Sequence, residues 1–308
     1  MNKFMKVLAA SALVATALVG CGKSAKYAKV GFGIHIVPGE QTSTTVATVG
    51  LDKDGKVQYL DLDCVQAPNS KDETKSKKEL GSEYGMKGAS AAAGQIKDGA
   101  EWDAQAKAFE EWAKGKTLDE IAKVDTMDYH GGKAPKTGTD LAAGCTIVID
   151  DFLAAIDEAG KNAVEVEADK IGAGETITWD TEKPQKNSTF VSVALDADGK
   201  VVWTSVDVSQ NPNGKDETKS KKELGSEYGM KGASAAAGQI KDGAEWDAQA
   251  KAFEEWTKGK TAEEVAGVEL MDYHGGKAAK TGSDLAAGCT MVITDFLSAF
   301  DEAVKAAQ

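Results

Sequence analysis

Apolar and polar residues alternate over residues 42–50 and again over 56–63, with Asp54 and Gly55 between the two runs. This alternation is typical of β-strands with one buried face, and an Asp-Gly pair favours a tight hairpin turn. The same pattern recurs around Asp198 and Gly199. We therefore expect one antiparallel hairpin in each part of the chain.

Other stretches place apolar residues at helical spacing. One helix is predicted around Trp102, Ala106 and Phe109, and another from Thr146 onward. The pairs Thr117/Glu120 and Asp98/Glu101 have the spacing of capping boxes, which begin helices. This order of elements predicts an α+β fold in which small antiparallel sheets are packed with helices.

A long internal repeat organises the chain. Residues 71–112 recur letter for letter as residues 215–256, an offset of 144 positions (215 − 71). Solenoid and propeller repeats have periods of roughly 20 to 50 residues, so this period corresponds to a whole domain. We expect two tandem homologous domains, residues 21–163 and 164–308, with a boundary between Gly160 and Lys170.

The first twenty residues have the pattern of an export signal. Lys3 and Lys6 flank the start of an apolar run that ends at Leu18, too short for a bilayer core of roughly 30 Å. A small-residue cleavage site then ends in Cys21. We expect cleavage before Cys21, lipidation of that residue, and a chain held by its lipid on the extracellular face of the cell membrane. The alternative is an ordinary secreted protein with a chance cysteine.

The net charge, the cysteines and the missing motifs indicate which partners and classes of protein are not expected. The whole chain carries a net charge of −13, and removal of residues 1–20 leaves 34 − 49 = −15. Such a surface repels phosphate backbones, so nucleic acid is not an expected partner. The remaining cysteines, Cys64, Cys145 and Cys289, are expected to be free thiols. No metal-ligand spacing or dinucleotide motif is present in the sequence, so a hydrolase or metalloenzyme is not expected.

One short segment is repeated with identical spacing, Asp140-Leu-Ala-Ala-Gly144-Cys145-Thr146 and Asp284-Leu-Ala-Ala-Gly288-Cys289-Thr290. It resembles the motif of FMN-binding domains modified by a flavin transferase, Asp-x-x-Ser/Thr-Gly-Ala-Ser/Thr, in which the FMN phosphate is esterified to the last hydroxyl. The segment departs from that motif twice. Ala143 and Ala287 replace a hydroxyl residue, and the two cysteines replace alanine.

Over nearly its whole length the chain is similar to two-domain lipoproteins of Gram-positive bacteria. These combine a lipobox with a Glu-x-Gly-x-x-Tyr-Gly-Met-Lys segment, present here at residues 79–87, and the segment described above. They are flavinylated carriers of extracellular electron transfer, and some release a peptide pheromone from the signal peptide. The resemblance implies two covalent FMN groups, on Thr146 and Thr290. It implies as partners a flavin transferase, a membrane quinol-oxidising electron donor, and exterior acceptors such as ferric iron or free flavins.

The chemical properties of these residues can be compared with the FMN sites that the resemblance implies. Thr146 and Thr290 are expected at a helix start, where unpaired N–H groups and the helix dipole favour phosphate. Gly144 and Gly288 are expected to let the backbone come close to phosphate or transferase. Plain helix capping explains the same threonines without a cofactor. Candidates for the flavin pocket, with core packing as the alternative, are Tyr84, Met86, Tyr228 and Met230.

The expected function is therefore that of a redox carrier rather than of an enzyme with a dedicated substrate. Two alternatives stay open at this point. One is an extracellular flavin-dependent reductase of a specific small molecule, and the other is a cofactor-free surface lipoprotein or pheromone precursor.

Overall fold

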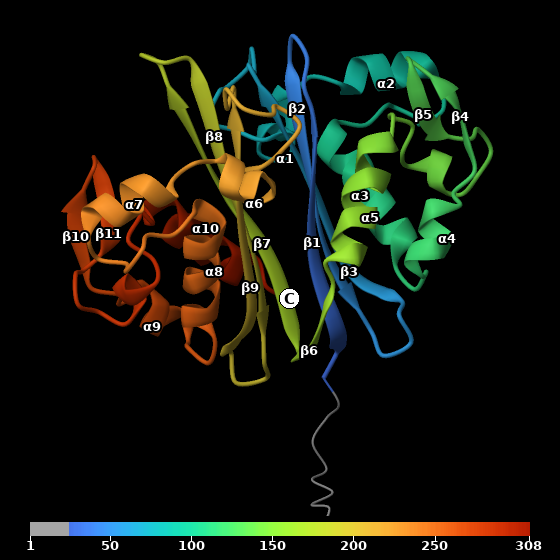
Figure 1. The fold of residues 1–308 in the computed structure, drawn as a ribbon. Helices are drawn as coiled ribbons and strands as arrows, with labels where there is room; N and C mark the ends of the chain where they lie inside the picture. Colours follow the sequence, from blue (N-terminus) through green and yellow to red (C-terminus); the bar gives the residue numbers. More distant parts are fainter. Residues whose placement is uncertain (1–24) are drawn as a thin grey trace, which may run out of the picture.

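The computed structural model describes residues 25–308. The export signal and Cys21 lie outside the described residues. Two antiparallel sheets stack against each other at the centre of the molecule, and helices cover the outer face of each (Figure 1). The predicted α+β class, with small antiparallel sheets packed with helices, is confirmed.

The first sheet has the strand order β3-β2-β1-β6, and all neighbours are antiparallel. Its strands are β1 (Tyr27–Val37), β2 (Thr42–Leu51), β3 (Val57–Ala67) and β6 (Val164–Ala168). The predicted hairpin is confirmed as β2 and β3, and Gly55 adopts a φ of +74° in its turn. Glycine is favoured there because a side chain disfavours a positive φ.

The second sheet has the order β7-β8-β9. Its strands are β7 (Lys170–Asp180), β8 (Gln185–Leu195) and β9 (Val201–Asn211), and Gly199 again has a positive φ, +78°, in the hairpin turn. The chain crosses between the sheets at Asp169. The predicted cut before residue 164 assigns β6 to the second half, but β6 pairs with β1 and so lies in the first sheet.

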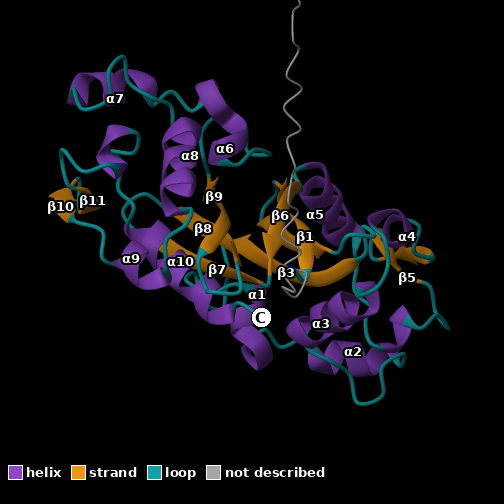
Figure 2. Cartoon of the chain, turned by 90° about the horizontal axis from the view of Figure 1, so that it is seen from below, coloured by secondary structure: helices purple, strands orange, loops and turns teal. Residues whose placement is uncertain are grey.

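The same helices and small hairpins follow in each half, in the same order (Figure 2). In the first half they are α1 (Lys77–Leu80), α2 (Lys87–Ala93), α3 (Trp102–Ala113), α4 (Leu118–Ala122), β4 (Thr126–Tyr129), β5 (Gly132–Pro135) and α5 (Asp150–Lys161). In the second half they are α6 (Lys221–Leu224), α7 (Lys231–Ala237), α8 (Trp246–Thr257), α9 (Ala262–Ala266), β10 (Leu270–Tyr273), β11 (Gly276–Ala279) and α10 (Thr294–Ala306). In the described part of the chain, no helix has both the length and the apolar character needed to cross a bilayer.

The two predicted capping boxes have different outcomes. Thr117 and Glu120 form the predicted reciprocal pair at the start of α4. The box at Asp98 and Glu101 is wrong, because Asp98 lies in a turn with a φ of +67° and Glu101 itself is the N-cap of α3. The Glu101 carboxylate instead accepts a hydrogen bond from the Met86 backbone N–H at 2.7 Å.

Helices α3 and α5 close the outer face of the first sheet. Phe109 and Phe152 meet edge to face there, with ring centroids 5.6 Å apart, in a core that α8 and α10 repeat on the second sheet. Helix α5 approaches β1 very closely. A Cβ atom on Gly33 would lie 2.1 Å from the Ala155 carbonyl oxygen, so only glycine fits at that point.

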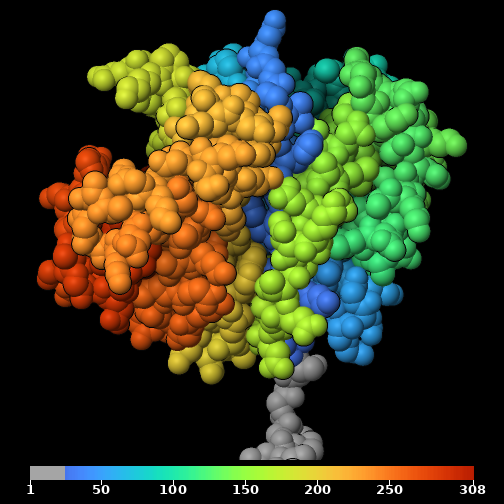
Figure 3. Space-filling model, in the orientation of Figure 1, coloured from blue at the N-terminus to red at the C-terminus, as the bar shows by residue number. Residues whose placement is uncertain are grey.

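The inner faces of the two sheets form a further core. Phe32 and Ile34 of the first sheet pack with Phe190 of the second, and the surfaces of the two halves meet along a continuous seam (Figure 3). A buried lysine crosses this interface: the Lys186 ammonium lies 2.7 Å from Glu73 and donates to a first-sheet carbonyl, that of Gln66, at 2.6 Å. The two halves are therefore packed against each other rather than joined by a loose tether.

Candidate functional site

Two matched pockets lie one in each half, on the helix side of each sheet. The first, of about 360 Å³, is here called the Thr146 pocket, and the second, of about 370 Å³, the Thr290 pocket. The residues that line the first include Met86, Trp102, Gln105, Tyr129, His130 and Thr146. Their counterparts in the second are Met230, Trp246, Gln249, Tyr273, His274 and Thr290. Four separate segments of each half therefore converge on one predicted threonine.

Each threonine is held by a glutamine on the facing helix. The Thr146 hydroxyl donates to Gln105 Oε1 at 3.1 Å, and the Thr146 N–H donates to the same oxygen at 2.9 Å. Thr290 and Gln249 repeat both bonds at 3.2 and 2.9 Å. A neutral amide oxygen orients a hydroxyl but is too weak a base to take its proton. The pocket positions the hydroxyl without activating it.

The expectation that Thr146 begins a helix is wrong, and the same holds for Thr290. Helix α5 begins at Asp150, and its N-cap is Ile149. The backbone explains the delay, because the Ile149 N–H donates to the Lys133 carbonyl of β5 at 2.8 Å. The chain is thus held against a strand before it can turn into the helix. Phosphate binding by a helix N-terminus therefore has no support at Thr146.

The other residues of the repeated segment lie outside the pockets. Asp140 and Asp284 are exposed. A Cβ atom on Gly144 would lie 2.7 Å from the Ala108 Cβ, so this glycine lets a turn pack on α3 rather than admitting phosphate. Gly288 meets Ala252 in the same way, at 2.8 Å.

The cysteines of the described chain are free thiols, as predicted, and all three are buried. Cys145 and Cys289 belong to the outer cores and are fully buried. Burial raises the pKa of each of these two thiols to about 12. They contribute packing and are unreactive near neutral pH.

Three of the four predicted pocket residues line a pocket, and the fourth does not. Met86 and Met230 line the two pockets, and their sulfur atoms lie 3.5 and 3.3 Å from the amide nitrogens of Gln105 and Gln249. Tyr228 lines the Thr290 pocket, whereas Tyr84 packs against the outer core of the first half. Three of the four therefore lie beside a candidate threonine.

Sequence reasoning missed Gln105 as a pocket residue, although the helical pattern contained a signal for it. Gln105 lies on the apolar face of α3, between Trp102 and Phe109, and is fully buried. A buried amide needs hydrogen-bond partners. Its nitrogen donates to the Ala100 carbonyl at 3.1 Å, and its oxygen accepts from Thr146. A polar residue on an otherwise apolar helix face was therefore the clue.

A histidine in a left-handed conformation lies at each pocket. His130 has a φ of +47° and His274 a φ of +45°. His130 is the first residue of the two-residue turn between β4 and β5, where Tyr129 pairs with Gly132. Non-glycine residues are uncommon in this conformation, and such strain is concentrated at functional sites. Its recurrence in both halves makes the two histidines site candidates.

Each pocket is also lined by one partly buried lysine. The Lys77 ammonium lies 5.3 Å from the Tyr84 ring centroid, and Lys221 lies 5.5 Å from that of Tyr228. Burial lowers the pKa of Lys221 to about 8, against the opposing charges of Asp295 and Asp207. Burial also opposes the charge on Lys77, yet its neighbours, first Cys64 and then Tyr84, raise its pKa. The cation of the second pocket therefore loses its proton at a lower pH.

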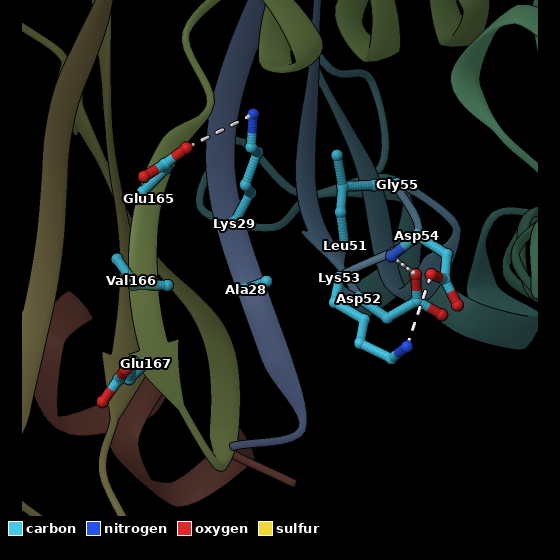
Figure 4. A pocket seen from close by; sticks show the side chains of 10 residues that line it. All are labelled: Ala28, Lys29, Leu51, Asp52, Lys53, Asp54, Gly55, Glu165, Val166 and Glu167. Carbon is cyan, nitrogen blue, oxygen red and sulfur yellow. Dashed lines mark hydrogen bonds and ion pairs between the residues drawn. The ribbon is translucent and has the colours of Figure 1, made fainter. Parts of the chain in front are cut away.

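A different cavity, of about 870 Å³, lies between β1, β6 and the β2–β3 turn (Figure 4). Its walls are mainly charged: Lys29 lies 4.0 Å from Glu165, and Lys53 lies 3.5 Å from Asp54. None of its lining residues is aromatic. It has no wall on which a flat ring could stack, unlike the two threonine pockets.

Within residues 25–308, no group of three or more histidine, cysteine or acidic side chains is arranged to hold a metal ion. The site is thus defined by its own geometry: a hydroxyl, a thioether, aromatic rings, a strained histidine and a lysine, occurring twice. No protein-family model matches the chain, and no curated protein or solved structure is significantly similar to it.

Proposed function

We propose that this chain is a membrane-anchored extracellular electron-transfer flavoprotein with one FMN joined through its phosphate to Thr146 and another to Thr290. In this proposal it consists of two tandem homologous FMN-binding domains that meet between β6 and β7, and it is held outside the cell by lipidated Cys21. The observation that carries the proposal is the recurrence of one pocket, in which a single threonine lines the same cavity as thioether and aromatic side chains.

The residues present fit such a group. A flat heteroaromatic ring packs well on a methionine sulfur and on aromatic rings, and Met86 and Tyr129 both line the Thr146 pocket. The Lys77 ammonium and the Ser90 hydroxyl add polar partners on the same pocket wall. Bound FMN supplies reversible uptake and release of electrons, while the chain supplies placement and electrostatics.

The bond between Thr146 and Gln105 bears on how the cofactor is attached. The hydroxyl is oriented, but no base among residues 25–308 accepts its proton within hydrogen-bond distance. A separate flavin transferase must therefore supply the base and the activated flavin nucleotide. A membrane quinol-oxidising protein is the proposed electron donor, and ferric iron or free flavins are the proposed acceptors.

The test is the intact mass of the protein made in cells that contain a flavin transferase. Two FMN additions are expected for the native sequence, and one for Thr146→Ala or Thr290→Ala. Thr137→Ala is the matched control, because this exposed threonine bonds only to Gln95 and Met127 and should leave both flavins in place. A colourless, unmodified product would reject the proposal and favour a cofactor-free lipoprotein.

A further inference from the structure

The two pockets have matching walls but differ in the sheet residues beside them. On the first sheet, His35, Thr45 and Cys64 are direct neighbours on β1, β2 and β3. On the second sheet the corresponding row on β7, β8 and β9 is Thr176, Thr189 and Val208. The first row therefore contains a titratable imidazole and a thiol, whereas the second contains only hydroxyl and methyl groups.

The correspondence between His35 and Thr176 follows from the packing of the two strands. A Cβ atom on Gly33 would meet the Ala155 carbonyl, and one on Gly174 would meet the equivalent Ala299 carbonyl. Gly33 and Gly174 thus occupy the same place, and His35 and Thr176 each lie two residues further along. The histidine is a difference between two otherwise repeated sites.

His35 reaches the Thr146 pocket through one carboxylate. Its Nε2 lies 3.8 Å from Asp151 Oδ1, and Asp151 lines that pocket. Among residues 25–308 the equivalent Asp295 forms no ion pair with a histidine, and the opposite charge that acts on it is that of Lys221. The charge next to the Thr146 pocket therefore depends on whether His35 carries a proton.

Among the other groups near His35, Glu158 has a raised pKa, about 7, that falls between pH 5 and 7.5. From β2 and β3, His35 faces the Thr45 hydroxyl and the Cys64 thiol, whose pKa is raised by burial. From α1 the pocket receives Lys77, whose pKa is also raised. Helix α5 adds Glu158, which bonds the neighbouring Ile34 backbone and titrates near the upper end of this range. Asp151 is the carboxylate that lies next to the imidazole itself.

Building on the proposed function, we propose that the His35–Asp151 pair makes the two flavin sites unequal, giving the Thr146 site the higher midpoint potential at acidic pH. Imidazole is the side-chain group whose charge usually changes around neutral pH. Protonated His35 neutralises Asp151, so added electrons meet less negative charge in this pocket than they do when His35 is neutral. Threonine at position 176 gives the Thr290 site no such change. His35 is not among the residues that line the pocket, so it acts on the flavin site only through the charge of Asp151.

One added charge near a partly buried site changes an equilibrium on the order of tenfold. For the ratio of reduced to oxidised flavin this corresponds to about 30 mV in a two-electron couple. Below pH 8 Lys221 keeps most of its charge, so the comparison is made between pH 5.0 and 7.5. The proton uptake of the flavin itself is common to both sites and cancels in their difference.

The experiment uses single-flavin proteins, Thr290→Ala to report the Thr146 site and Thr146→Ala to report the Thr290 site. Spectroelectrochemical titration should show a higher potential for the Thr146 site at pH 5.0 and a difference that shrinks toward pH 7.5. His35→Thr or His35→Gln should remove the pH dependence of the difference in midpoint potential between the two sites. Thr176→His should give the Thr290 site the same pH dependence. Because the His35 side chain is 40% exposed, its replacement should not prevent folding.

The possible failures are distinguishable. Two flavins whose potentials coincide at every pH, or a difference that survives both His35 substitutions, would overturn this inference and leave the proposed function intact. A protein that takes up no flavin at all would overturn both.

Discussion

The Thr48 hydroxyl lies 2.6 Å from the Ser192 hydroxyl, and these two residues occupy the same position in the two repeats, 144 residues apart. A residue that contacts its own counterpart lies on or near a two-fold axis. The inner sheet faces therefore meet through equivalent surfaces, β2 against β8. The helices that cover the outer face of each sheet therefore lie on opposite sides of the shared interface (Figure 1).

The Thr48–Ser192 bond gives the first prediction. Both residues are almost completely buried. Thr48→Val keeps the shape of the side chain but removes the partner of the Ser192 hydroxyl, which should lower the free energy of unfolding by about 1–3 kcal/mol. Adding Ser192→Ala should restore much of that loss, because no buried hydroxyl is then unpaired. Urea unfolding of the single and double variants measures the coupling. Equal losses that simply add would contradict the bond.

A second prediction concerns the close approach of α5 to β1. Gly33→Ala places a Cβ atom 2.1 Å from the Ala155 carbonyl oxygen, and the helix must move away. We expect a loss of about 3 kcal/mol in the free energy of unfolding. Gly39→Ala is the matched control, since its Cβ would meet nothing closer than 3.6 Å. Equal thermal midpoints for the two variants would show that the helix does not lie this close.

A third prediction follows from Glu158 in the groove between the halves. Burial, and next the charge of Glu223, raise the pKa of Glu158 to about 7. A raised folded-state pKa means that the stabilising contribution is complete below the ordinary carboxyl value of about 4 and is lost as the pH rises towards 7. The thermal midpoint should therefore fall over this range, and Glu158→Gln should make the fall shallower.

Part of the slope should remain in that variant. Burial also raises the pKa of Asp63 and of Asp207 to about 6, and these two groups act in the same direction. Glu111→Gln is the control, because this exposed residue pairs only with Lys114 at the surface. Parallel pH profiles for the native protein and Glu158→Gln would contradict the assignment.

The strained histidine gives a fourth prediction. His130→Asn creates the Asn-Gly sequence that favours a two-residue turn with positive φ at both positions. The thermal stability should therefore increase slightly, by about 0.5 kcal/mol in free energy. If His130 has a role in the flavin site, the same substitution should alter the visible spectrum of the flavin bound at Thr146. A more stable variant with an unchanged spectrum would mean that the strain has no role at the pocket.

Much of the local structure could be predicted from sequence, because the information is local. Alternation and the Asp-Gly pairs defined both hairpins, and Thr117 with Glu120 defined a helix start. The repeat predicted that the helices and small hairpins of the first half recur in the second. Trp102 and Phe109 were correctly assigned to an apolar helix face, since that face depends on spacing alone.

The composition of the pockets could not be derived in this way. Gln105 and His130 come from segments that no local pattern connects to Thr146, and only the packing of α3 and the β4–β5 turn brings them together. The start of α5 was misplaced for a similar reason. A hydrogen bond from Ile149 to the distant Lys133 outweighs the helical pattern that begins at Thr146.

The sequence by itself determined that one α+β plan is used twice and that each copy offers one threonine in a repeated segment. The tertiary structure alone decided that Thr48 meets Ser192, that Gln105 holds Thr146, and that His35 lies next to Asp151 of one pocket, where the corresponding position of the second sheet is Thr176. The physical reason is that spacing along a chain fixes periodicity and turns. Contacts between distant segments depend on how sheets and helices exclude water together, which spacing does not encode.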